Sequence, residues 1–192
     1  IAGSLDEALT GAHLYHAPLR VLATPRRLAV VCDGVATRQP DRQEEVKGPP
    51  VRIAFDADGN PTRAAEGFAR KVGVAVADCE RGEDQRGEHL LVRRTIAGRD
   101  ATAVLAECLP PVILGLPFRK TMRWRDLAVE YARPLQWLVC LLGEEVVPLQ
   151  VGDLTGGRTT RGHRTLAGDR RAELASATDY EAVMQQLHVE PD

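Results

Sequence analysis

Residues 117–137, PFRKTMRWRDLAVEYARPLQW, contain both tryptophans of the chain, a basic cluster and two prolines. Four cations lie within seven residues around Trp124: Arg119, Lys120, Arg123 and Arg125. An indole ring can stack on a base or on a guanidinium group, so this composition is typical of a surface that contacts phosphate groups. The same residues also fit a simpler interpretation, in which Trp and Met are core side chains beside a solvated charged rim.

The composition of the whole chain limits the class of protein. The chain has 192 residues, 44% of them apolar and 27% charged, so it can bury a core as one large domain or two small ones. Its formal net charge of -2 excludes a domain that binds nucleic acid with its whole surface. Any binding of nucleic acid must therefore come from local groups of arginine.

The cysteine pattern and the hydropathy predict where the protein functions. Cys32, Cys79, Cys108 and Cys140 are widely spaced and include no CxxC pair, so we expect buried free thiols and no metal site. The sequence has neither an apolar run of about 20 residues nor a signal-peptide pattern at its start, which predicts a cytoplasmic protein. The chain begins without Met and ends abruptly, so we expect a fragment of a longer protein.

Near the start of the chain, residues 4–11 have the apolar spacing of a helix, and two strands are predicted at 19–22 and 28–32. The segment TPRR interrupts the strands, and its proline predicts that Arg26 and Arg27 emerge at a strand edge or turn. These arginines either have a functional role or only protect an exposed sheet edge from aggregation.

The middle of the chain alternates between connectors and regular elements. Residues 36–50 mix charges with prolines and predict a connector with one short strand at its end, and residues 51–55 alternate as an extended segment would. Residues 63–72 predict a helix with Thr62 as its N-cap and Gly73 as its stop. The outward cations of this helix, Arg63, Arg70 and Lys71, are interpreted most simply as solvated.

The next two elements are a strand and a helix. Residues 88–96 predict the strand, and residues 101–114 have helical spacing that Pro110 and Pro111 should kink or split.

The last third of the chain predicts a buried β-hairpin from residues 135–142 and 146–151, and then a capped helix at 176–187. Between them, the segment GDLTGGRTTRGHR at 152–164 combines a permissive backbone with a second basic group. Exposed amides and guanidinium groups both suit a phosphate. The candidate residues of this group are Arg158, Arg161, His163 and Arg164.

These elements predict an α+β fold with mixed, largely antiparallel sheets and short packed helices. We expect an N-terminal α+β region over residues 1–115. A second α+β region over 116–192 should contain the hairpin, the Gly/Arg loop and the C-terminal helix. The sequence contains none of the GxSxG, HExxH, Walker or GxGxxG motifs, so no catalytic residue is assigned and a non-catalytic module is predicted.

Several short blocks occur in a recognisable order: ATPRRLAV at 23–30, KGP at 47–49, AAEGFA at 64–69, KTMRW at 120–124, RP at 133–134 with Trp137, LLG at 141–143 and RGHR at 161–164. In order and approximate spacing they resemble the N-terminal region of the β subunit of bacterial glycyl-tRNA synthetase, over essentially the whole chain. The family's opening strand and its large C-terminal regions are absent, which indicates an N-terminal fragment. Arg125 and Thr165 replace a usual Gly and a usual aromatic residue, so the two loops that carry them are expected to differ in geometry.

The resemblance implies a subunit of a heterotetramer of two α and two β subunits that attaches glycine to tRNA(Gly). ATP and Mg²⁺ serve the whole enzyme, the α subunit activates glycine, and this fragment needs no cofactor and is inactive alone. We expect a basic face that contacts tRNA or the α subunit, with these candidates: Arg26, Arg27, Arg119, Lys120, Arg123, Trp124, Arg158, Arg161, His163 and Arg164.

Two other interpretations remain open. In the first, Trp124, Trp137 and the apolar hairpin form an assembly interface without RNA contact. In the second, the fragment has a hydrolytic activity in which His163 is the single plausible participant.

Overall fold

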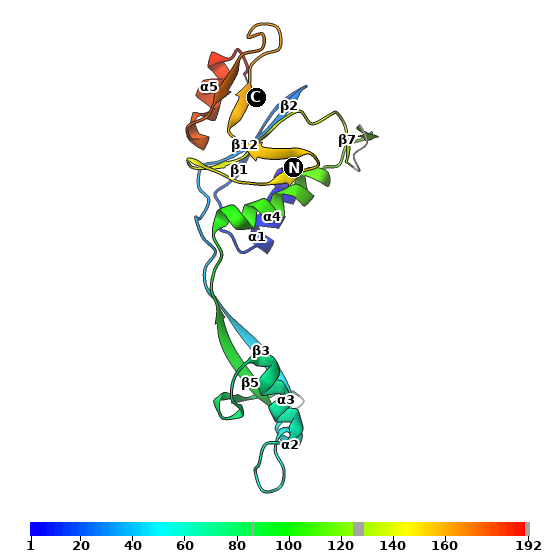
Figure 1. Ribbon diagram of the computed structural model, residues 1–192, viewed down its shortest axis with the longest axis vertical. Helices are drawn as coiled ribbons and strands as arrows, with labels where there is room; N and C mark the ends of the chain where they lie inside the picture. Colours follow the sequence, from blue (N-terminus) through cyan, green and yellow to red (C-terminus); the bar gives the residue numbers. More distant parts are fainter. Residues whose placement is uncertain (86, 125–128, 191–192) are drawn as a thin grey trace. The chain divides into compact units, whose positions relative to one another are not determined.

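The computed structural model describes residues 1–85, 87–124 and 129–190 (Figure 1). The chain forms two compact units, one from Ile1–Pro40 with Arg99–Asp192 and one from Asp41–Gly98. Both units combine helices with short, mostly antiparallel strands, so the α+β prediction is confirmed. The division differs from the boundary expected between residues 115 and 116, because the second unit is a single insertion within the first.

The inserted unit is a three-stranded antiparallel sheet in the order β3-β5-β4. Ala54, Ala65 and Leu90 form its core, with Phe55 and Phe68 packed against them. Its elements are β3 (Arg42–Pro50), α2 (Val51–Ala54), α3 (Arg63–Val72), the 3-10 helix η1 (Val76–Asp78), β4 (Glu80–Asp84) and β5 (Gly87–Ile96). The predictions for α3 and β5 are confirmed, including the caps of α3: Thr62 accepts a hydrogen bond from the amide of Ala64, and Gly73 is left-handed.

The prediction of a connector over residues 36–50 is wrong, because β3 is a strand of nine residues. On β3, Glu44 and Glu45 lie opposite Arg94 and Arg93 of β5 and form ion pairs with them at 2.6 Å and 2.8 Å. A strand is usually recognised in a sequence by alternating apolar residues. β3 has charged residues that pair across the strands instead, so this pattern is missing. Residues 51–54 also differ from the extended segment expected there, since they form the short helix α2.

Gly48 lies under the ring of Phe68, at a register shift between Lys47 and Pro50 in β3. A Cβ atom at this position would lie 2.7–2.9 Å from three carbons of that ring. Because Phe68 belongs to the core of the unit, we expect Gly48→Ala to lower the free energy of unfolding by about 1–3 kcal/mol.

Urea unfolding of the whole chain measures this effect. The matched control is Gly67→Ala in α3, where an added Cβ atom meets no atom within 4 Å. An unchanged free energy of unfolding for Gly48→Ala would contradict the packing of Phe68 over β3.

The other unit contains the helices α1 and α4, which lie side by side against short strands (Figure 1). Leu9, Val104 and Leu149 belong to its main core cluster. The elements are α1 (Ala2–Gly11), β1 (Leu19–Thr24), β2 (Arg27–Cys32), α4 (Ala101–Leu114), β6 (Met122–Arg123), β7 (Glu130–Tyr131), β8 (Leu138–Val139), β9 (Leu141–Leu142), β10 (Glu145–Val146), β11 (Gln150–Val151), β12 (Leu154–Gly157), β13 (Thr159–Arg161), β14 (Arg171–Glu173), the 3-10 helix η2 (Ala177–Asp179) and α5 (Tyr180–Gln186). The predicted N-terminal helix, the first two strands and the capped C-terminal helix are confirmed.

Two predictions for this unit need correction. Pro110 and Pro111 do not split α4, which continues to Leu114 although the two prolines remove the amides that would meet the carbonyls of Ala106 and Glu107. The expected buried hairpin is limited to β9 and β10, whose two-residue turn uses Gly143 at φ 58°. Since Pro148 interrupts the second strand, β11 pairs with β12 instead, and β8 joins β12 in parallel.

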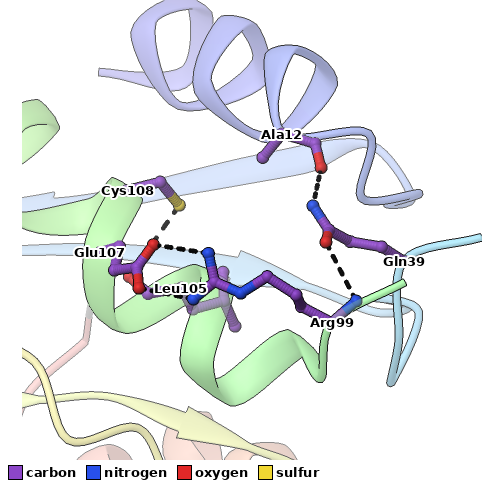
Figure 2. A network of polar contacts seen from close by, with 6 residues as sticks. All are labelled: Ala12, Gln39, Arg99, Leu105, Glu107 and Cys108. Carbon is purple, nitrogen blue, oxygen red and sulfur yellow. Dashed lines mark hydrogen bonds and ion pairs between the residues drawn. The ribbon is translucent and has the colours of Figure 1, made fainter. Parts of the chain in front are cut away.

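The two chain segments that lead out of this unit are tied together by a polar network (Figure 2). Gln39 donates from its side chain to the carbonyl of Ala12, at the end of α1, and accepts from the amide of Arg99 at 3.1 Å. The guanidinium group of Arg99 holds both carboxylate oxygens of Glu107 on α4, at 2.8 Å and 2.5 Å. Both segments are therefore anchored to the helices of the unit from which they leave.

The cysteines are free thiols and half-buried. Burial raises the pKa of Cys140 to about 12, so its thiol stays protonated and unreactive at neutral pH.

Among the described residues, no helix is both long enough and apolar enough to cross a membrane.

Candidate nucleic-acid interface

The segment from β13 to β14 is a two-stranded ribbon in which basic side chains gather. Thr160 and Ala172 lie opposite each other and face α5, where the Thr160 hydroxyl contacts the sulfur of Met184 at 3.5 Å. Alternation along the strands places Arg161 and Arg171, which are also opposite each other, on the other face. Like charges in such a cross-strand pair are destabilising unless an anion neutralises them.

The loop that joins the two strands adds further positive charge. We use the name basic ribbon for Arg161, Arg164, Arg170 and Arg171, of which Arg161 is half-buried and the other three are exposed. Among the described residues, no carboxylate forms an ion pair with any of these four guanidinium groups. The basic ribbon thus holds four cations without an ion-pair partner among the described residues, and Asp169 is the one acidic residue of its loop.

Trp137 supports the base of the ribbon. The guanidinium carbons of Arg161 and Arg27 lie 5.1 Å and 5.5 Å from its ring centroid, within the range of cation–π attraction. Arg27 also donates to the carbonyl of Arg161 at 2.6 Å and contacts the sulfur of Met184 at 3.1 Å. Burial lowers the pKa of Arg27, and its Nε atom is buried without a hydrogen-bond partner among the described residues. Arg27 therefore connects the start of β2 to the ribbon from inside.

Three other candidates have partners within the fold. Arg158 donates to the backbone carbonyls of Leu174, Ala175 and Glu144 at 2.9–3.4 Å, so its guanidinium group cross-links three segments of the unit. Arg123 pairs with Glu130 at 3.3 Å across β6 and β7, and the indole N–H of Trp124 donates to the carbonyl of Tyr131 at 2.9 Å. These contacts hold the three side chains within the fold. If one of these side chains also contacts RNA, it must do so while it keeps these contacts.

His163 organises the loop of the ribbon. Its Nδ1 atom accepts hydrogen bonds from the amides of Thr165 and Leu166 at 3.2 Å and 3.1 Å, which places the proton of the neutral ring on Nε2. A ring nitrogen that accepts from two amides is not free to act as a base. This geometry favours a structural role for His163 over a hydrolytic one.

Arg26, Arg119 and Lys120 are exposed cations outside the ribbon. Arg26 lies in the two-residue turn between β1 and β2, as the sequence predicts. Arg119 and Lys120 lie in the loop before β6. Arg125, the fourth cation of that stretch, lies outside the described residues.

The structure thus brings Arg27 and Arg161 together, and it adds three residues that the sequence interpretation did not select as phosphate contacts: Trp137, Arg170 and Arg171. The signal for two of them was present, since Arg170 and Arg171 close the segment RGHRTLAGDRR. The register that sets Arg171 opposite Arg161 could not be predicted, because the strands of the ribbon are only three residues long.

Comparison with known proteins gives a consistent result. The family model described as glycyl-tRNA synthetase beta subunit matches residues 1–192. The glycine–tRNA ligase beta subunit of Syntrophotalea carbinolica is 47% identical over 162 residues, which cover 84% of this chain and 23% of that protein. The proteins of the same name from Myxococcus xanthus and Acaryochloris marina are 44% and 41% identical, over 98% and 100% of this chain and 27% of each relative. The chain spans about a quarter of the length of these relatives.

Proposed function

Because the chain belongs to the glycyl-tRNA synthetase β-subunit family, we propose that it is a non-catalytic part of a glycine–tRNA ligase that contacts tRNA(Gly) through the basic ribbon. In this proposal the whole enzyme attaches glycine to tRNA at the expense of ATP. Glycine, ATP and Mg²⁺ are handled by a separate α subunit, in an assembly of two α and two β subunits in the cytoplasm. The chain described here would provide a positively charged surface for tRNA and would contribute no catalytic residue.

The observation that carries the proposal is the uncompensated charge of the basic ribbon. Arg161 and Arg171 lie opposite each other without a carboxylate partner among the described residues, at a cost in stability of about 0.2–1 kcal/mol. A phosphodiester between them would reverse the sign of that interaction. Guanidinium groups suit phosphate oxygens because their N–H groups can form two parallel hydrogen bonds. Such contacts position an RNA without reading its sequence.

The test is the salt dependence of tRNA(Gly) binding by the complete α/β complex. We expect the double variant Arg164→Gln with Arg170→Gln to lower the slope of log K against log salt by about 2 units, because each phosphate contact contributes a little less than one unit. The affinity near physiological salt should fall about tenfold.

The matched control removes two arginines of the same unit that already pair with carboxylates. Arg20 bonds to Glu181 at 2.7 Å and Arg99 to Glu107 at 2.5 Å. The double variant Arg20→Gln with Arg99→Gln should change the slope by less than about half a unit. Equal slopes for wild type and the ribbon variant would contradict the proposal.

Subunit assembly is the second candidate function, and the outer face of the β1–β2 hairpin favours it. Val21 lies opposite Val30, and Ala23 lies opposite Leu28, all on the face that points away from the buried Leu22. Val21 and Leu28 are 37% and 41% exposed, so this face presents apolar side chains to the solvent. A hairpin face of this kind suits an apolar partner surface such as the α subunit.

If this face binds the α subunit, Val21→Asp should weaken the α/β association measured by sedimentation. The slope of log K against log salt for tRNA binding should stay unchanged.

A further inference from the structure

The outward surface of α3, in the inserted unit, has no role in the function proposed above. Its inner side packs through Ala65, Phe68 and Ala69, which are buried or half-buried. Residues at helical spacing of three, four and seven share the opposite side, and all of them are exposed. We call this the α3 surface, formed by Arg63, Glu66, Gly67, Arg70 and Lys71.

Gly67 has no structural reason to be glycine. A Cβ atom added there meets no atom within 4 Å, and the backbone is ordinary right-handed helix. Glycine in the interior of a helix costs roughly 1 kcal/mol relative to alanine. At Gly48 and Gly162, by contrast, an added Cβ atom would come within 3.0 Å of neighbouring atoms. The absence of a side chain at Gly67 therefore leaves this part of the helix backbone accessible from solvent.

The charges around Gly67 are mainly positive, with three cations and one carboxylate. Among the described residues, no carboxylate pairs with Arg63, Arg70 or Lys71, and Glu66 is the one acidic residue of α3. Two arginines of the sheet in the same unit differ. Arg93 bonds to Glu45 and Glu80, and Arg94 bonds to Glu44. The three cations of the α3 surface have no such partner among the described residues, and they outnumber the one carboxylate beside them.

We propose that the α3 surface is a second contact for the RNA sugar–phosphate backbone, separate from the basic ribbon. Gly67 lets a phosphate or ribose approach the helix closely, and Arg63, Arg70 and Lys71 neutralise the phosphates on both sides. Charge complementarity selects a polyanion as the partner, and the proposal rests on tRNA being the RNA that the protein binds. The inserted unit is then a second RNA-binding arm of the chain.

The test uses two variants in the complete α/β complex. Gly67→Ala should unfold no earlier than wild type, because alanine favours the helix, while its affinity for tRNA(Gly) falls about fivefold, since the methyl group holds the backbone away. The triple variant Arg63→Gln, Arg70→Gln and Lys71→Gln should lower the salt slope by about 2–3 units. A merely solvated face would give the gain in stability without any loss of affinity.

The ribbon variant Arg164→Gln with Arg170→Gln is measured in parallel to separate this inference from the function on which it rests. A lower slope for both sets of variants supports both contacts. A lower slope for the ribbon variant alone overturns the inference and leaves the proposed function standing. Unchanged slopes for all variants overturn both, and weaker α/β association with unchanged tRNA affinity in the α3 variants also overturns the inference.

Discussion

Gly162→Ala is expected to destabilise the protein by about 3 kcal/mol, which is a change of roughly two orders of magnitude in the folding equilibrium. A Cβ atom at Gly162 would lie 2.5 Å from the Cβ atom of Ala167 and 3.0 Å from the carbonyl oxygen of Leu187. Both neighbours are fixed. Ala167 is held by a hydrogen bond to the carbonyl of His163, and the carbonyl of Leu187 accepts from the amide of His163 at 2.9 Å.

The clash cannot be relieved by rotating a flexible side chain, because one neighbour is backbone and the other is a single methyl group. We therefore expect the loop of the ribbon to separate from the end of α5. Urea unfolding of Gly162→Ala measures the cost, with Gly157→Ala as the control, since its nearest contact would be a carbonyl oxygen at 4.0 Å. A cost below about 0.5 kcal/mol would show that this close approach is not maintained.

Arg27→Ala is expected to lower the free energy of unfolding by about 2–4 kcal/mol. The substitution removes the hydrogen bond to the carbonyl of Arg161, the contact with Met184 and one of the two cations at Trp137. It also leaves space beside the half-buried ring of Tyr180, whose pKa burial raises. The loss therefore combines a cavity with an unsatisfied carbonyl group.

Arg26→Ala provides the matched control, because Arg26 is the neighbouring residue, carries the same charge and is exposed in the turn. Its effect on stability should be within about 0.5 kcal/mol. Thermal and urea unfolding of both variants test the difference. Equal stabilities would mean that Arg27 acts as a surface cation and does not connect β2 with the ribbon.

Local signals explain which parts of the fold could be predicted from the sequence. The caps of α3, Thr62 and Gly73, act within one helical turn, and so does the capping box at Ser176 that starts the C-terminal helix. The Pro-Arg turn between β1 and β2 is similarly local. In each case the residues that determine the structure are neighbours in the sequence.

The features that could not be predicted depend on partners far away in the chain. β3 is recognised as a strand only when its glutamates meet the arginines of β5, about fifty residues later. The same holds for the site, where Arg27 meets Trp137 and Arg161 across more than one hundred residues. The basic composition was visible in the sequence. It could not reveal which arginines the fold uses internally, such as Arg27 and Arg158, and which it leaves free.

Photo-crosslinking from Leu166 tests directly whether the basic ribbon contacts tRNA(Gly), because this side chain lies in the loop of the ribbon and is 67% exposed. A benzophenone amino acid at that position, in the complete α/β complex, should crosslink to tRNA(Gly) in a reaction that added salt suppresses. The same probe at Leu114, which is 42% exposed at the end of α4, serves as the control and should give little RNA product. Crosslinks from position 166 to protein alone would contradict the RNA contact and assign the basic ribbon to subunit assembly.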